Sequence, residues 1–193
     1  MILRTSTRSN DQVADLIWVA RARGGDHDFK RAITNVMVEE DRIYASDGHV
    51  LHIYHGSLKE LKPGLYAVAR LNKTLIELYL YDGKPEKYPD ISKVVPRYDV
   101  TKGFVYGCKS SIELSMPSGY YSSLYDDYAK ILRATADYTN ADGEPRPITY
   151  NLDLLAKSMS GMTKVWLPKK GLDPLSFTGK NRFAVVMPMR MAE

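Results

Sequence analysis

The chain has 193 residues, of which 44% are hydrophobic and 26% are charged, as in an ordinary globular protein of one large or two small domains. No apolar stretch approaches the roughly 20 residues that span a bilayer, and the N-terminus lacks the apolar core of a secretory signal. The single cysteine, Cys108, excludes an internal disulfide and an all-cysteine metal site. These features favour a cytoplasmic protein with no membrane partner. The formal net charge of +4 is too small by itself to indicate nucleic-acid binding.

The first half of the chain predicts an alternation of helix and strands. Residues 10–22 carry apolar side chains at helical spacing, which predicts a helix. Segments rich in β-branched residues and bounded by turn residues predict strands at 32–38, 42–46, 49–54 and 65–68. A second helix is predicted around Leu75, because Leu71 and Leu78 fall on the same side of such a helix. Turn residues follow, and we place a domain boundary near residues 86–96.

The second half repeats this order of elements. Strand-like segments lie at 103–106, 111–115, 148–150, 164–167, 175–177 and 183–189. One helix is predicted at 123–135, and Asn151 is placed to cap another that ends at Met159. The repeated order predicts an α+β internal duplication rather than a βαβ series. We therefore expect two domains, residues 1–88 and 89–193.

Three histidines, His49, His52 and His55, are spaced by three residues and raise the question of a metal site. On a strand, alternate residues face opposite ways, so His52 would point away from the other two. This geometry favours partly exposed strand histidines over metal binding. The alternative is an enzyme that uses these histidines with a metal ion.

No other group of residues predicts catalysis. Asp126 and Asp127 are adjacent and would diverge by about 100° on a helix, which favours a solvated face over a shared substrate site. Cys108 has no obvious histidine partner, so a small buried residue is the simpler interpretation. The chain has no phosphate-binding glycine loop and no nucleophile elbow. We expect no catalytic residues, no bound metal and no cofactor.

Basic residues on the predicted helices suggest a diffuse phosphate-binding surface. They are Arg21, Arg23, Lys73, Lys130, Arg133 and Lys157. If these helices share one solvent-facing side, their side chains would bind duplex DNA without reading its sequence. The alternative is an ordinary solvated helix surface.

The tail at 184–191 contains methionines on both sides of a proline. One interpretation is a buried terminal strand with a proline at its edge. The other is a surface that accepts varied apolar side chains, because methionine is flexible and polarisable.

Four segments resemble the bacterial DNA sliding clamp, the DNA polymerase III beta subunit. Residues 183–191, FAVVMPMRM, resemble the C-terminal signature of that family. Residues 45–51, ASDGHVL, resemble the segment A-T-D-G-H-R-L of its middle domain. The linker between its middle and last domains resembles YPDISKVVP at 88–96. A strand and helix of its last domain are similar to YNLDLLAKSM at 150–159.

The resemblance implies a two-domain α+β clamp fold, with helices on one face and antiparallel sheets on the other. Residues 1–88 would correspond to the family's middle domain and residues 89–193 to its last domain, both trimmed, with the first domain missing. It also implies a non-enzymatic processivity factor that encircles or tracks DNA and tethers polymerase, clamp loader and other partners through clamp-motif peptides. Six domains at two per chain would make a homotrimer the simplest closed ring.

The resemblance further implies a peptide-binding pocket. Carried over position by position, its residues are Ile33, Ser46, Gly48, His49, Leu51, Pro89, Lys93, Val94, Leu172, Pro174, Val185, Val186, Met187, Pro188, Met189 and Arg190. Val50 replaces the family's arginine after the histidine, and Lys93 replaces another arginine; these departures concern the peptide preference rather than the pocket itself. The alternative function is a monomeric adaptor or decoy that binds clamp-interacting peptides without encircling DNA.

Overall fold

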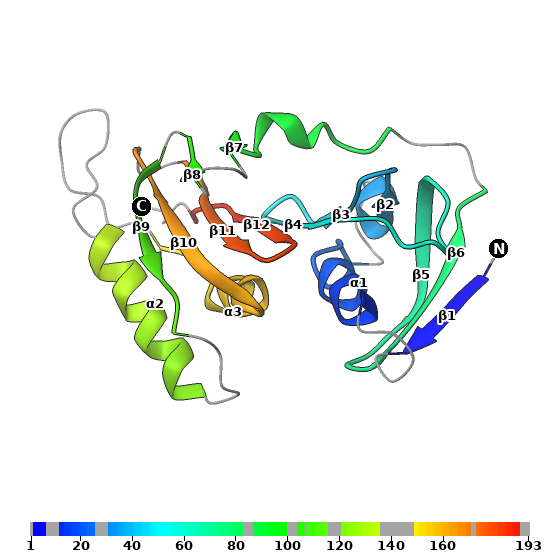
Figure 1. The fold of residues 1–193 in the computed structure, drawn as a ribbon, viewed down its shortest axis with the longest axis horizontal. Helices are drawn as coiled ribbons and strands as arrows, with labels where there is room; N and C mark the ends of the chain where they lie inside the picture. The colour runs from blue at the N-terminus through cyan, green and yellow to red at the C-terminus, as the bar shows by residue number, and fades with distance from the viewer. Residues whose placement is uncertain are drawn as a thin grey trace. The chain divides into compact units, whose positions relative to one another are not determined.

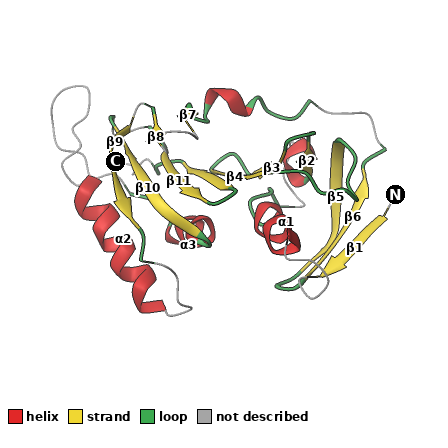
Figure 2. Cartoon of the chain, in the orientation of Figure 1, coloured by secondary structure: helices red, strands yellow, loops and turns green. Residues whose placement is uncertain are grey.

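The computed structural model describes residues 2–6, 12–25, 31–82, 87–99, 104–106, 108–115, 121–135, 149–170 and 173–189. The chain divides into two compact units, Met1–Asp90 and Ile91–Glu193. Each unit contains antiparallel strands and at least one helix (Figure 1, Figure 2). No helix among the described residues is long and apolar enough to cross a membrane.

The first unit contains an antiparallel sheet. Its strands are β1 (Ile2–Ser6), β2 (Val36–Val38), β3 (Arg42–Ser46), β4 (Val50–His55), β5 (Gly64–Leu71) and β6 (Leu75–Leu80). They lie in the order β1-β6-β5-β2-β3-β4. The sequence did not predict β1, which pairs with β6 from Ile2 opposite Tyr79 to Ser6 opposite Leu75.

Helix α1 (Gln12–Ala20) packs on this sheet and confirms the first predicted helix. Its apolar face, including Leu16, is fully buried. The ring of Trp18 stacks on His52 of β4 with 4.1 Å between ring centroids and 4° between planes. The His52 Nδ1 atom lies 2.9 Å from the Trp18 carbonyl oxygen. His52 is 0% exposed, so the prediction of a partly exposed histidine is wrong at this position, because α1 covers it.

The second predicted helix of the first unit is wrong, because β5 and β6 form a hairpin there. Asn72 Oδ1 accepts hydrogen bonds from the backbone N–H groups of Thr74 and Leu75 at 2.9 and 2.7 Å. Such an Asx turn supplies the reversal that a helix would lack. Ile76 and Leu78 are fully buried, as expected for alternate residues on a strand.

The predicted strand at 32–38 is correct only in its second part. Residues Arg31–Thr34 form the 3₁₀ helix η1, and β2 begins at Val36. Ala32 and Ile33 are nonetheless buried. Their apolar character therefore reflects packing of the helical turn rather than a strand.

The second unit contains a sheet of four antiparallel strands among its described residues. They are β9 (Cys108–Glu113), β10 (Met162–Pro168), β11 (Leu175–Gly179) and β12 (Arg182–Val186), in the order β12-β11-β10-β9. Two short strands, β7 (Tyr98–Asp99) and β8 (Phe104–Val105), form a separate hairpin. The 3₁₀ helix η2 (Ile91–Lys93) precedes them. The predicted strand at 183–189 is shorter in the structure, because β12 ends at Val186. An isolated bridge then joins Met189 to Thr149.

Two helices accompany this sheet, and both confirm predicted helices. Helix α3 (Leu152–Met159) contacts β10 and β12, and α2 (Tyr121–Thr135) contacts β10 and α3. Asn151 caps α3, because its Oδ1 accepts from the N–H groups of Asp153 and Leu154.

The expectation of a solvated Asp126-Asp127 face is wrong for Asp127, which is 1% exposed. Its Oδ2 accepts from the backbone N–H of Ser115 at 2.8 Å, and its Oδ1 accepts from the Ser115 hydroxyl at 3.0 Å. The exposed Lys130 ammonium donates to the same Oδ1 at 2.9 Å. Asp127 therefore joins α2 to the residues that follow β9.

Candidate peptide-binding site

In the first unit, the predicted site residues centre on the tight turn between β3 and β4. Gly48 has φ of 92°, a backbone conformation that favours glycine. The Ser46 hydroxyl accepts from the Gly48 N–H, and Asp47 Oδ1 accepts from the N–H groups of His49 and Val50. These side-chain hydrogen bonds hold the turn, so the exposed His49 is presented on a defined backbone.

Tyr88 fixes the following linker segment to the same turn. Its hydroxyl accepts from the Ser46 N–H at 2.8 Å, and its ring meets Tyr44 edge-on at 5.3 Å between centroids. Burial raises the pKa of the Tyr88 phenol well above its ordinary value. Tyr88 therefore stays neutral, and Pro89 next to it is exposed.

The predicted residues of the first unit differ in exposure. Gly48, His49 and Pro89 are exposed, and Ser46 is half-buried. Ile33 and Leu51 are 8% and 3% exposed. The exposed residues are available for contact, whereas Ile33 and Leu51 mainly support the backbone beneath them.

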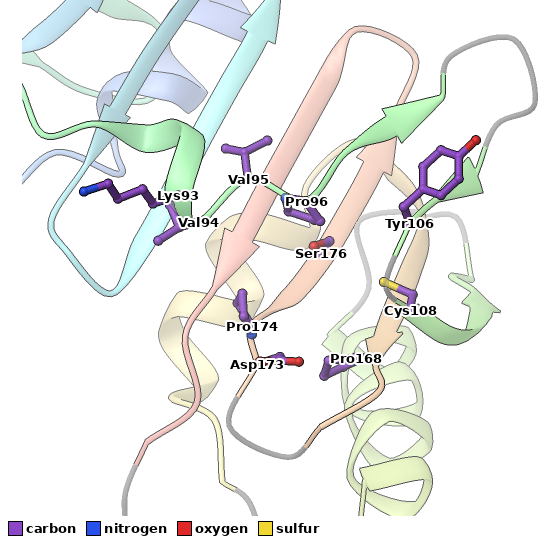
Figure 3. A pocket seen from close by; sticks show the side chains of 10 residues that line it. All are labelled: Lys93, Val94, Val95, Pro96, Tyr106, Cys108, Pro168, Asp173, Pro174 and Ser176. Atoms are coloured by element: carbon purple, nitrogen blue, oxygen red, sulfur yellow. The ribbon is translucent and has the colours of Figure 1, made fainter.

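In the second unit, a cavity of about 200 Å³ contains part of the predicted set (Figure 3). It is lined by Lys93, Val94, Val95, Pro96, Tyr106, Cys108, Pro168, Asp173, Pro174 and Ser176. Three of these, Lys93, Val94 and Pro174, belong to the predicted pocket. All ten lining residues belong to the second unit, so its own fold forms this cavity.

Local backbone geometry brings the lining residues together. The N–H groups of Val94 and Val95 both donate to the Ile91 carbonyl, which closes the turn after η2. The N–H of Tyr106 donates to the Arg97 carbonyl, and the Arg97 guanidinium lies 5.4 Å from the centroid of the Tyr106 ring. These contacts fix Tyr106 next to the turn.

The far side of the cavity begins where strand pairing becomes irregular. Pro168 lies opposite Cys108 after a register shift between β9 and β10. Such an irregularity suits proline, which has no N–H to donate. Asp173 closes a turn by donating its N–H to the Lys170 carbonyl, and Pro174 leads into β11. This wall therefore lies at one end of the sheet.

The cavity contains polar groups of three kinds. Lys93 and Asp173 are exposed, so it carries one side chain of each charge. Burial raises the pKa of the Cys108 thiol, and the nearby Asp173 carboxylate adds to the effect. Cys108 is 9% exposed, so the expected small buried cysteine is confirmed and a raised pKa disfavours nucleophilic thiolate. The Ser176 hydroxyl is buried and makes no hydrogen bond within the described part of the chain.

The C-terminal tail changes from core to surface along its length. Val185 and Val186 are buried in β12. Met187 and Pro188 are half-buried, and Met189 is 48% exposed. The Met189 N–H donates to the Thr149 carbonyl at 2.8 Å, so the tail stays attached to the unit while its last described methionine faces solvent. The predicted Leu172 and Arg190 lie outside the described residues.

Sequence reasoning missed much of the cavity. The residues it did not predict are Val95, Pro96, Tyr106, Cys108, Pro168, Asp173 and Ser176. Tyr106 and Cys108 lie within 97–147, where the sequence resembles the clamp family poorly. The prolines bounding predicted turns were the available signal, because proline-rich edges mark places where sheet pairing ends.

The basic residues predicted to face DNA occupy different kinds of structure. Arg21 is exposed just after α1, and Arg23 is half-buried, with its Nη1 donating to the Gly24 carbonyl. Lys73 lies in the turn between β5 and β6, so its placement on a helix is wrong. The others lie on α2 and α3 as expected, with exposed side chains: Lys130, Arg133 and Lys157.

The histidine run does not form a cluster. His49 lies in the β3–β4 turn, His52 beneath α1 and His55 at the exposed end of β4. No group of three or more histidine, cysteine, aspartate or glutamate side chains suited to a metal ion occurs within the described ranges.

Solved sliding clamps share this fold along the whole chain. The beta subunit of Thermotoga maritima DNA polymerase III covers 100% of the chain at 12% identity, with a TM-score of 0.56. The beta chain from Streptococcus pneumoniae covers 99% at 11% identity, with a TM-score of 0.58. A sliding clamp from Bartonella birtlesii, solved with griselimycin bound, covers 98% at 14% identity, with a TM-score of 0.52.

The chain spans only 65–66% of the length of these clamp chains. No protein-family model and no curated protein sequence matches it. The chain therefore has the two-domain sliding-clamp fold over 65–66% of the length of these clamp chains, and the likeness is one of structure at low sequence identity.

Proposed function

We propose that this chain is a sliding-clamp-like processivity factor that holds partner proteins on duplex DNA through a peptide-binding site. The observation that carries the proposal is the clamp fold over the whole chain, found in the beta subunits of DNA polymerase III. A fold alone does not fix a function. The exposed apolar residues at the predicted site, Val94 and Met189, add a local reason to expect binding of apolar peptide side chains.

The mechanism is tethering rather than catalysis. A clamp that surrounds DNA keeps its partner nearby and raises the partner's effective concentration without strong contacts to the duplex. The DNA contacts would come from Arg21, Arg23, Lys73, Lys130, Arg133 and Lys157. Such phosphate contacts are independent of sequence and weaken steeply with salt. Polymerase and clamp loader are the expected partners, in the cytoplasm.

Ring formation is the first step to test. If a closed ring contains six clamp domains and each chain supplies two, three chains form the ring. Light scattering should then give three times the 21.8 kDa chain mass. Charge reversal at Arg21, Lys73 and Lys157 should then lower DNA association and its dependence on salt. Unchanged DNA association in that triple variant would refute the assigned DNA surface.

Peptide binding is the second step, and griselimycin provides a defined ligand because a related clamp was solved with it. His49→Ala and Met189→Ala should each weaken griselimycin binding while leaving the fold intact, because both side chains are exposed at the predicted site. His55→Ala is the matched control, since His55 is exposed at the other end of β4. Equal affinity in all three variants would remove these site assignments.

A monomeric adaptor or decoy is the second candidate function. The chain spans 65–66% of the length of the clamp chains it resembles, and an adaptor would keep the predicted peptide site without closing a ring. A monomer at every concentration with griselimycin binding retained would support the adaptor. A closed oligomer that stays on circular DNA and leaves it on linearisation would support the ring.

A further inference from the structure

We propose that the cavity beside Cys108 accepts an aliphatic side chain of an extended partner peptide, and that Asp173 pairs with a basic residue adjacent to it. This inference rests on the proposed peptide-binding function and names the chemistry of the peptide. It concerns a wall made by Tyr106, Cys108, Pro168, Asp173 and Ser176, which the predicted site did not include.

The walls of the cavity favour an aliphatic side chain. Val94 and Val95 contribute branched apolar groups, and three prolines line the same space. Proline has no backbone N–H, so these walls offer few donors to a polar ligand. Tyr106 lies at the edge of the cavity, and its ring, which contacts Arg97, points away from Pro96 and Cys108 (Figure 3).

The floor contains a polar group suited to a peptide backbone. Ser176 is 0% exposed, and its hydroxyl makes no hydrogen bond within the described residues. Buried hydroxyls are normally hydrogen-bonded, because leaving one unpaired is unfavourable. A peptide amide entering with the aliphatic side chain would supply the missing partner. Ser176 thus points to a ligand independently of the apolar walls.

The charged side chains around the cavity favour a basic peptide residue next to the aliphatic one. Asp173 is exposed and forms no ion pair within the described part of the chain. Lys93 also lines the cavity, and Lys169 lies close enough to Cys108 to act on its thiol. A basic peptide residue would be repelled by these two lysines and attracted by Asp173. We therefore expect that residue to lie on the Asp173 side of the cavity.

The test uses the full chain and three peptides that carry fluorescein at the N-terminus: fluorescein-Ser-Leu-Leu-Lys-amide, its Leu-Leu→Ala-Ala form and its Lys→Glu form. The parent peptide should bind most tightly, and each change should weaken binding about tenfold. Asp173→Lys should reverse the order of the Lys and Glu peptides, with Asp173→Asn intermediate. Tryptophan fluorescence in a Trp18→Phe background, where only Trp166 remains, checks that both variants remain folded.

Alkylation of Cys108 gives an independent readout, because Cys108 is the only cysteine of the chain. Saturating parent peptide should slow its reaction with iodoacetamide at least about fivefold, whereas the Ala-Ala peptide at the same concentration should not. If the peptides bind but neither protect Cys108 nor respond to Asp173→Lys, the inference is overturned and the proposed function stands. If neither they nor griselimycin bind, both fail. If griselimycin alone binds, only the inference fails.

Discussion

Replacing Asp127 with alanine should destabilise the second unit far more than removing its charged partner. The buried carboxylate accepts two hydrogen bonds from Ser115 and one from Lys130. A hydrogen bond to a charged group is worth about 1.5–3 kcal/mol, and the donors of the exposed Ser115 and Lys130 can bind water once the carboxylate is removed. Allowing for relaxation towards water, we expect Asp127→Ala to lower the free energy of unfolding by about 3 kcal/mol.

Lys130→Ala is the matched control. The Lys130 side chain is 46% exposed, and exposed ion pairs contribute roughly 0–1 kcal/mol. Asp127→Asn should lie between the two, because the amide keeps one acceptor oxygen for Ser115. This order separates the hydrogen bonds to Ser115 from the ion pair.

The assay can report on one unit at a time. The chain has two tryptophans, and Trp166 lies in β10 of the second unit while Trp18 lies in α1 of the first. In a Trp18→Phe background, urea unfolding followed by fluorescence therefore reports on the second unit. A loss of about 3 kcal/mol would lower the melting temperature of a unit of this size by more than ~10 °C. Equal stability of Asp127→Ala and Lys130→Ala would refute the role given to the Ser115 contacts.

Three further predictions follow from local geometry. His52→Ala should lower the stability of the first unit by about 3 kcal/mol and change Trp18 fluorescence, because it removes a stacked ring and leaves a cavity under α1; His55→Ala is the control, and equal melting curves would contradict the packing role. Gly161→Ala should lower the free energy of unfolding in urea by about 1–2 kcal/mol, because Gly161 has φ of 74° and an added Cβ would lie 2.7 Å from Arg182 Nη1. Gly48→Ala is the control and should lower it less, because Gly48 also has a positive φ but an added Cβ there would meet no atom within 4 Å. Burial raises the pKa of Cys108, so less thiolate is present at a given pH and its alkylation in the free protein should rise with pH at a midpoint above that of free cysteine; a midpoint at or below the free value would contradict this.

The sequence best predicts those helices and strands whose ends are marked by a capping or turn residue. Asn151 is an example, because its side chain caps α3 using atoms two and three residues away. The β5–β6 hairpin was missed because Leu71, Leu75 and Leu78 are spaced as on a helix. The decisive signal was the Asx turn at Asn72, which makes a reversal between two strands and ends any helical run.

Burial of single polar side chains could not be predicted, because their partners are distant in sequence. His52 lies against Trp18, 34 residues away, and Asp127 binds Ser115, 12 residues away. Spacing along a strand or helix gives only the direction of a side chain. Whether that direction leads to solvent depends on which element packs there, which is a property of the tertiary structure.

The same distinction separates the two parts of the candidate site. The turn at Gly48 and the residues around Val94 lie in segments that resemble the clamp family, and their local backbone is held by contacts within a few residues. The wall formed by Tyr106 and Cys108 comes from a segment that resembles it poorly, and Cys108 meets Pro168 through the pairing of β9 with β10. We therefore expect the affinity for peptides in general to depend on the Gly48 turn and the residues around Val94. The preference for one peptide over another should depend on the wall beside Asp173. Substitutions at Asp173 should change whether the Lys or the Glu peptide is preferred, whereas substitutions at Val94, in the apolar wall, should weaken these two leucine peptides alike.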